Sequence, residues 1–216
     1  MKSYWDEFYT HPDENICNAS QFAKHVADQL TTPCTILDVG CGNCRDSNYF
    51  AKRGHHVTAV DTACSHCRDS SLIYIQEDVL KYLKRTSCRY DIIYMRWILH
   101  ALPKPVQCEV VKHASRCLSE LGCIWIENRS INDHVLLAHS TYDDEDGSHT
   151  TSHKRWPASQ EEFLSMFEHS NASIVFLDES RGFSPSGSRD YNTDPLLFRI
   201  KAVRKDDAQL GAASSD

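Results

Sequence analysis

The sequence has no long hydrophobic run, and its first residues are not hydrophobic. Its most apolar stretch, residues 91–102, is interrupted by Arg96 and His100 and is shorter than a membrane-spanning helix. The first nine residues, MKSYWDEFY, lack the apolar segment of a secretory signal. We therefore expect a cytoplasmic protein with no membrane partner.

Extended basic blocks are also missing, because Lys and Arg never occur in runs of more than two and the formal net charge is −7. Proteins that bind phosphodiester backbones display clustered basic surface, so we expect no nucleic-acid partner. Ten cysteines without a secretory signal indicate reduced intracellular thiols rather than a disulfide framework. A length of 216 residues favours one domain, as a monomer or a homodimer.

The most informative stretch is residues 34–61. An apolar strand leads into a turn with Gly40 and Gly42, a helix follows, and a second strand ends at Asp61. This arrangement suits a nucleotide-like ligand at the strand ends. The glycines let the backbone approach the ligand, the helix N-terminus offers unpaired N–H groups, and the Asp61 carboxylate can accept hydrogen bonds from two ribose hydroxyls.

The same stretch narrows the class of ligand. A dinucleotide site would need a third glycine three residues after Gly42, and that position is Arg45. Asp38 precedes the glycines instead, where a carboxylate would repel a pyrophosphate and suit an ammonium group. Asp-x-Gly-x-Gly with an acid ending the next strand resembles motif I of class I S-adenosylmethionine (SAM) methyltransferases. Cys44 departs from that pattern, in which a small residue, most often glycine, is usual; cysteine fits there unless the backbone needs a positive φ.

This resemblance implies roles for the acids and glycines. Asp38, Gly40 and Gly42 would hold the methionine part of SAM, and Asp61 would hold the ribose. At the end of the third expected strand, Asp78 would accept from the adenine amino group while the N–H of Val79 faces the ring. The alternative is that Asp61 and Asp78 only cap helices.

Strands and helices alternate along residues 34–127, which predicts a parallel sheet covered on both faces. With the resemblance, the expected fold is α/β, a Rossmann-like doubly wound seven-stranded sheet, mostly parallel, with a C-terminal antiparallel hairpin. Residues 1–33 are expected to form an N-terminal flap and helix, residues 34–205 the methyltransferase domain, and residues 206–216 a disordered tail. Residues 130–157 lack regular periodicity and are predicted to form a lid with one helical turn.

Residues for the methyl acceptor are expected after the fourth and fifth strands and in the lid. Arg96 would bind an anionic acceptor group or the SAM carboxylate, and His100 or His153 would take a proton. Tyr-Trp-x-x-Phe-Tyr, Cys-Gly-Asn-x-Arg-Asp-Ser, Arg-x-x-x-His-Ala and Glu-x-Arg-Ser together resemble a tellurite-resistance-type subgroup found near glycan-modification genes. That resemblance implies O- or N-methylation of a small polar acceptor, anionic among the options. The acceptor-binding residues would be Tyr4, Tyr9, Arg129, His153 and Arg155.

Two other hypotheses remain open. Cys41-x-x-Cys44 and Cys64-x-x-Cys67 have the spacing of a zinc site, although both pairs fall in loops that the SAM site needs. We therefore predict no metal, and treat the cysteines as small fillers of a turn and a helix. A catalytically inactive SAM-fold protein that binds or regulates a partner is the third hypothesis, and Cys44 is the residue in its favour.

Overall fold

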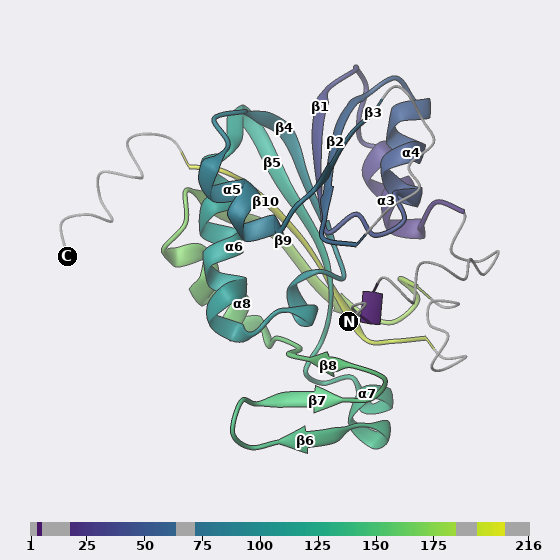
Figure 1. Ribbon diagram of the computed structural model, residues 1–216, viewed down its shortest axis with the longest axis vertical. Helices are drawn as coiled ribbons and strands as arrows, with labels where there is room; N and C mark the ends of the chain where they lie inside the picture. Colours follow the sequence, from purple (N-terminus) through teal and green to yellow (C-terminus); the bar gives the residue numbers. More distant parts are fainter. Residues whose placement is uncertain (1–3, 6–17, 64–71, 185–193, 206–216) are drawn as a thin grey trace.

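In a computed structural model, residues 4–5, 18–63, 72–184 and 194–205 are described, and they contain a central seven-stranded sheet (Figure 1). Its order is β3-β2-β1-β4-β5-β10-β9, in which the first five strands run parallel and β10 pairs antiparallel with both neighbours. The predicted fold is confirmed. The strands are β1 (Thr35–Val39), β2 (His56–Asp61), β3 (Leu72–Gln76), β4 (Tyr90–Arg96), β5 (Leu118–Arg129), β9 (Ala172–Ser180) and β10 (Leu197–Arg204).

Helices cover both faces of this sheet. One face carries α5 (Val79–Arg85), α6 (Lys104–Arg116) and α8 (Gln160–Glu168), and the other carries α3 (Gln21–Ala27) and α4 (Arg45–Lys52) (Figure 1). A 3-10 turn, η1 (Leu99–Ala101), follows β4. Because successive strand residues point to opposite faces, the neighbours Ile36 and Leu37 belong to different cores. β1 has β2 on one side and β4 on the other, so the strand order reverses there, the position where open α/β sheets bind ligands.

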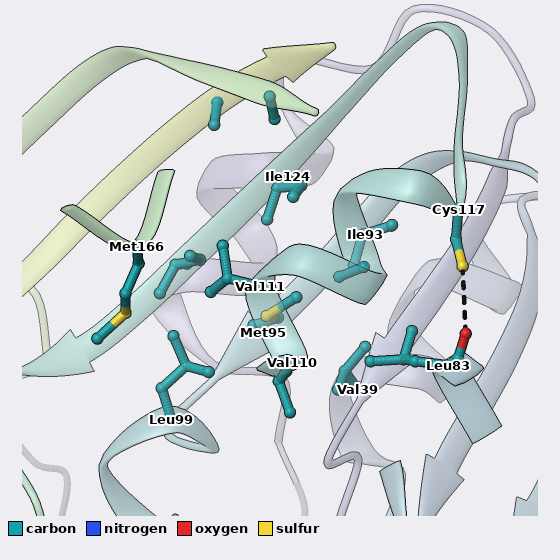
Figure 2. Close-up of a cluster of buried hydrophobic side chains, with 14 of the residues drawn as sticks. Val39, Leu83, Ile93, Met95, Leu99, Val110, Val111, Cys117, Ile124 and Met166 are labelled. Carbon is teal, nitrogen blue, oxygen red and sulfur yellow. Dashed lines mark hydrogen bonds between the residues drawn. The ribbon is translucent and has the colours of Figure 1, made fainter. Parts of the chain in front are cut away.

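The larger core lies under α5, α6 and α8. Figure 2 shows Val39, Ile93, Met95 and Ile124 on the strands meeting Leu83, Val110, Val111 and Met166 on the helices. The side chains of Ile93 and Ile124 have no exposed surface. Truncating either to alanine would cost about 2–5 kcal/mol, so this face is the rigid support for the strand ends.

Residues 130–157, which we call the insertion, extend from the body of the sheet (Figure 1). The predicted helical turn is present as α7 (His134–His139). The expected lack of further regular structure was wrong, because three short strands form an antiparallel sheet of order β6-β7-β8. These strands, β6 (Thr141–Asp143), β7 (Ser148–Thr150) and β8 (Lys154–Arg155), are too short to give a periodic signal. Lys154 joins β8 to the β6–β7 turn through Asp143 and Asp146, at 2.9 and 2.8 Å.

Among the described residues, no helix combines the length and the apolarity needed to cross a bilayer.

Candidate active site

The glycine turn after β1 is held against β2 by backbone hydrogen bonds. Gly40 has a φ of +75° and donates its N–H to the carbonyl of Val60 at 2.8 Å. A Cβ on Gly40 would lie 2.7 Å from the side chain of Ile98, so a larger residue does not fit. Gly42 also has a positive φ, +54°. The positive φ favours glycine at both positions, and the contact with Ile98 excludes a larger residue at Gly40.

Asp61 ties this turn to the end of β2. Its Oδ2 accepts the N–H of Gly42 at 2.9 Å, and its Oδ1 accepts the N–H of Ala63 at 2.9 Å. One carboxylate therefore fixes the spacing between two strand ends while its side chain remains partly exposed. The ribose contact stays a prediction that this position allows.

Asp38 is almost fully buried at the end of β1, with 2% of its surface exposed. Ser47 Oγ on α4 donates to Asp38 Oδ2 at 2.5 Å. Burial raises the pKa of Asp38 well above its ordinary value, because the charged form loses its hydration. A cationic group beside Asp38 would reverse that shift, which is the chemistry predicted for the ammonium of the ligand.

Cys44 occupies the position where the sequence pattern usually has glycine, and its φ is +61°. Cysteine is therefore strained at this position, at a cost of about 1–2 kcal/mol. The residue is fully buried at the N-cap of α4, where its side chain makes no capping hydrogen bond. Cys44 therefore combines a left-handed backbone conformation with a fully buried side chain.

The Sγ atoms of Cys41 and Cys44 lie 3.7 Å apart. Burial raises the pKa of the Cys41 thiol well above its ordinary value. The described residues contain no group of three or more side chains placed to hold a metal ion. Cys64 and Cys67 lie outside the described residues, so the four-cysteine hypothesis stays open.

Asp78 begins α5 as its N-cap. Its exposed side chain accepts the N–H of Lys81 at 2.9 Å, so the capping alternative is observed. Val79, the first helical residue, is buried with 6% of its surface exposed. The adenine contacts of Asp78 and Val79 remain predictions.

Sequence reasoning missed a buried network that connects α3 and α4 to the sheet. Asp46 accepts hydrogen bonds from the backbone N–H of Ser20 at 2.7 Å, from Ser20 Oγ at 2.8 Å and from Tyr94 Oη at 2.8 Å. Arg45 Nε is 3.7 Å from Asp46. An acid in the first turn of α4 and a serine before α3 were visible in the sequence, but nothing in the sequence pairs them.

Sequence reasoning also missed the partners of Arg96. The register of the sheet places Arg96 on β4, Glu127 on β5 and Arg199 on β10 side by side. Arg96 Nε donates to Glu127 Oε1 at 3.1 Å, and Arg199 Nε donates to Glu127 Oε2 at 2.9 Å. Glu127 has no exposed surface, so two guanidinium groups share one buried carboxylate.

The two arginines also hold the segment that follows β9. Arg96 Nη2 donates to Ser184 Oγ at 3.2 Å, and Arg199 Nη2 donates to the carbonyl of Phe183 at 3.0 Å. This network therefore links β4, β5, β10 and the end of β9 in one cluster at the strand ends.

Trp97 follows β4 directly and has a φ of +60°, which is uncommon for a bulky residue. Its N–H donates to the carbonyl of Glu127 at 2.9 Å. The guanidinium carbon of Arg96 is 4.5 Å from the indole centre, and that of Arg129 is 6.0 Å away. Left-handed backbone at such a position costs about 1–3 kcal/mol and is concentrated at functional sites.

His100 lies in η1 with 3% of its surface exposed. Its backbone N–H donates to Asn128 Oδ1 at 2.9 Å, its Nδ1 lies 3.1 Å from the same oxygen, and its carbonyl accepts the N–H of Trp156 at 2.7 Å. Burial, helped by the charges of Arg129 and Arg155, lowers the pKa of His100 well below its ordinary value. His100 is therefore a neutral residue that joins β4, β5 and the insertion, and its action as a base stays a prediction.

The other predicted acceptor residues fall into two groups. Arg129 Nε is 3.2 Å from Asp133 Oδ2, and both side chains are almost fully buried. Arg155 is buried on β8, where it donates to Thr151 Oγ1.

Tyr4 and His153 lie together, with ring centres 4.5 Å apart, and Tyr4 Oη is 3.1 Å from Ser152 Oγ. Tyr4 therefore contacts the insertion, and the N-terminal flap stays a prediction. Tyr9 lies outside the described residues.

The comparisons with known proteins agree with the fold. Residues 36–122 match a family model described as a methyltransferase domain. A search of curated proteins found no match.

Several solved structures share the fold. A 1,6-didemethyltoxoflavin-N1-methyltransferase from Burkholderia thailandensis, with S-adenosylhomocysteine bound, is 16% identical, with a TM-score of 0.63 over 86% of this chain and 77% of that chain. Magnesium protoporphyrin IX methyltransferase from Synechocystis PCC 6803, with SAH bound, is 15% identical, with a TM-score of 0.59 over 85% and 80%. TehB from Haemophilus influenzae is 16% identical, with a TM-score of 0.59 over 94% of this chain and 66% of that chain.

At these identities the structures establish the fold and leave the acceptor open. The chain therefore has the class I SAM-dependent methyltransferase fold, with a match to the methyltransferase-domain family over residues 36–122.

Proposed function

We propose that this protein transfers a methyl group from SAM to a small, polar, anionic acceptor. The observation that carries the proposal is the hydrogen bond from the Gly42 N–H to the Asp61 carboxylate. It connects the paired-glycine turn to the end of β2, at the position where the strand order reverses. The S-adenosylhomocysteine bound to two of the similar structures supports SAM as the cofactor.

In the cofactor half of the site, backbone and carboxylate groups do most of the binding. Asp38 would pair with the ammonium of the methionine part, next to the backbone of Gly40 and Gly42. Asp61 would accept from the ribose hydroxyls while it keeps its hydrogen bonds to the turn. Asp78 and Val79 would contact the adenine at the start of α5.

In the acceptor half, positive charge supports an anionic group. Arg96 is the predicted anion-binding residue, and Glu127 is shared between Arg96 and Arg199. Arg129 and Arg155 lie on the β5 end and the insertion, close enough to lower the pKa of His100 through their charge. These cations favour a carboxylate or phosphate on the acceptor.

Bound SAM supplies an electrophilic methyl group and its own leaving group. The residues of the chain would align the acceptor atom with that methyl carbon and exclude water. Tyr4 and His153 support this second task, because their contact brings the start of the chain onto the insertion. Where the acceptor is a hydroxyl or a protonated amine, His100 or His153 would take the proton, and Tyr9 would add a further contact.

The finer assignments belong to the same proposal. The B. thailandensis and Synechocystis enzymes are named for small molecules, 1,6-didemethyltoxoflavin and magnesium protoporphyrin IX, which supports a small acceptor. We propose a cytoplasmic enzyme, monomeric or homodimeric, with either an oxygen or a nitrogen as the methylated atom.

Calorimetric titration of the reduced protein with SAM, with and without a zinc chelator, tests the proposal. We expect saturable binding that the chelator leaves unchanged and that Asp61→Ala abolishes. The absence of binding, together with stoichiometric zinc in the protein, would replace the proposal with the four-cysteine metal site. Saturable SAM binding without methyl transfer to any tested acceptor would favour an inactive binding protein.

A further inference from the structure

Trp97 has a polar atom that the protein itself does not use. The indole Nε1 is buried and has no hydrogen-bond partner among the described residues. An indole nitrogen is a donor only, so its missing partner must be an acceptor atom such as an oxygen. Buried donors are nearly always paired, and an unpaired one therefore needs an explanation.

The backbone of Trp97 gives a second, independent indication. A bulky residue is held in the left-handed region by a hydrogen bond from its N–H to the carbonyl of Glu127. Strained backbone persists where the surrounding structure fixes it, and it clusters at sites that contact ligands. The strain sets the direction of the indole at the end of β4.

The surroundings indicate the charge of the missing partner. Arg96 lies over one part of the indole ring, and Arg96 shares the single carboxylate of Glu127 with Arg199. The two guanidinium groups and the one carboxylate leave one positive charge beside the indole. Asp46, another buried acid, has its own cation at 3.7 Å in Arg45.

The position of Trp97 connects the two halves of the site. The adjacent residue, Ile98, packs on Gly40 in the cofactor turn, because a Cβ on that glycine would be 2.7 Å from it. On the other side, Trp97 is bonded to β5 through Glu127. Trp97 is partly exposed as a residue, whereas its Nε1 atom is buried.

We propose that the indole N–H of Trp97 donates a hydrogen bond to a carboxylate or phosphate oxygen of a ligand, held beside the Arg96–Glu127–Arg199 cluster. This inference rests on the proposed function. Two sources offer that oxygen, the methyl acceptor and the methionine carboxylate of the cofactor. Trp97 is thus a specificity-determining residue of the site.

The test combines calorimetry with indole N–H NMR on the full chain and on Trp97→Phe, which keeps an aromatic ring and removes the N–H. The chain has four tryptophans, and Trp97→Phe identifies the indole signal of Trp97 by its loss. Three probes are used: S-adenosylhomocysteine, 5′-methylthioadenosine, which lacks the amino-acid carboxylate, and inorganic phosphate or benzoate added to the S-adenosylhomocysteine-saturated protein. Trp125→Phe is the matched control, since it removes a buried indole N–H from β5 outside the site.

We expect the Trp97 indole signal of the wild-type protein to shift when the oxyanion binds, and Trp97→Phe to weaken that binding about 10- to 100-fold. Weaker binding of phosphate or benzoate alone assigns the oxygen to the acceptor. Weaker binding of S-adenosylhomocysteine, with 5′-methylthioadenosine unchanged, assigns it to the cofactor carboxylate. Trp97→His, which restores a ring N–H, should recover part of the loss.

An unshifted Trp97 indole signal, or affinities for every probe that are unchanged in Trp97→Phe, would overturn the inference and leave the proposed function standing. Failure of the wild-type protein to bind S-adenosylhomocysteine would overturn both. If Trp97→Phe does not fold, Trp5→Phe, Trp125→Phe and Trp156→Phe assign the other three indole signals, and the wild-type NMR measurement still decides the question.

Discussion

The two halves of the site are held together by different kinds of interaction. In the β1–β2 half, a glycine turn and one carboxylate are connected by backbone hydrogen bonds from Gly40 and Gly42. In the β4–β5–β10 half, charged side chains make the connections, through Glu127 and its two arginines. The first half presents backbone groups in fixed positions. The second half contains charged side chains, and its stability depends on each residue of the Arg96–Glu127–Arg199 cluster.

This difference predicts that the halves respond differently to mutation. A backbone hydrogen bond survives most side-chain changes, whereas a buried ion cluster loses its balance when one member is removed. The predictions below test that contrast, beginning with the largest effect.

Removal of the shared carboxylate should have the largest effect on stability. Glu127→Ala leaves Arg96 and Arg199 buried without their common partner, and we expect a loss of about 3–5 kcal/mol in the free energy of unfolding. Urea unfolding measures it, with the exposed Glu120→Ala as control. A loss below about 1 kcal/mol would show that the cluster does not stabilise the acceptor half.

Gly40→Ala should have the next largest effect, because the new methyl group meets the side chain of Ile98 and the φ is positive. We expect a loss of about 2–4 kcal/mol and weaker SAM binding. Gly54→Ala is the matched control, since Gly54 has a φ of +90° with no atom within 4 Å of an added Cβ. It should lose only about 1 kcal/mol. Equal losses in the two variants would mean that the contact with Ile98 is unimportant.

The raised pKa of Asp38 predicts a pH dependence. The ligand-free folded protein holds a proton on Asp38 that the unfolded chain releases near pH 4, so stability falls as the pH rises from there towards the raised pKa. An ammonium group bound at Asp38 would favour the carboxylate, and SAM binding should therefore release up to one proton. Calorimetry in buffers of different ionisation enthalpy measures this proton. The release should disappear in Asp38→Asn, and equal release in both proteins would remove Asp38 from the cofactor site.

The smallest effect is expected at Cys44, where two contributions oppose each other. Cys44→Gly relieves the left-handed strain but loses a fully buried side chain, so we expect stability within about 1 kcal/mol of the wild type. Cys44→Ala keeps the strain and loses the sulfur contacts, and it should be the less stable variant by thermal unfolding. The reverse order would show that the strain is negligible.

The contrast between the halves also explains what could be predicted from the sequence. The proposed cofactor half was predicted from residues 34–61, where an apolar strand, paired glycines and a strand-end acid are close in sequence. The alternation of strands and helices along residues 34–127 was predicted as well, because apolar and capped segments such as β3 and α5 carry local signals.

The acceptor half could not be predicted in the same way. Arg96, Glu127 and Arg199 come together only through the register of three strands, and no local pattern connects them. Ser20 and Asp46 are likewise 26 residues apart. The strands of the insertion are two or three residues long, which is too short for a period-two pattern.

We propose that the β1–β2 half binds the cofactor and the β4–β5–β10 half binds the acceptor. The most direct test is hydrogen–deuterium exchange of the free and the S-adenosylhomocysteine-bound protein. We expect protection of the backbone N–H groups in residues 38–46 and 59–63, because the cofactor would cover the glycine turn and the end of β2 at Asp61. Residues 125–130 should change little until an acceptor is added. Protection confined to residues 125–130, with none at the glycine turn, would contradict the proposed division of the site.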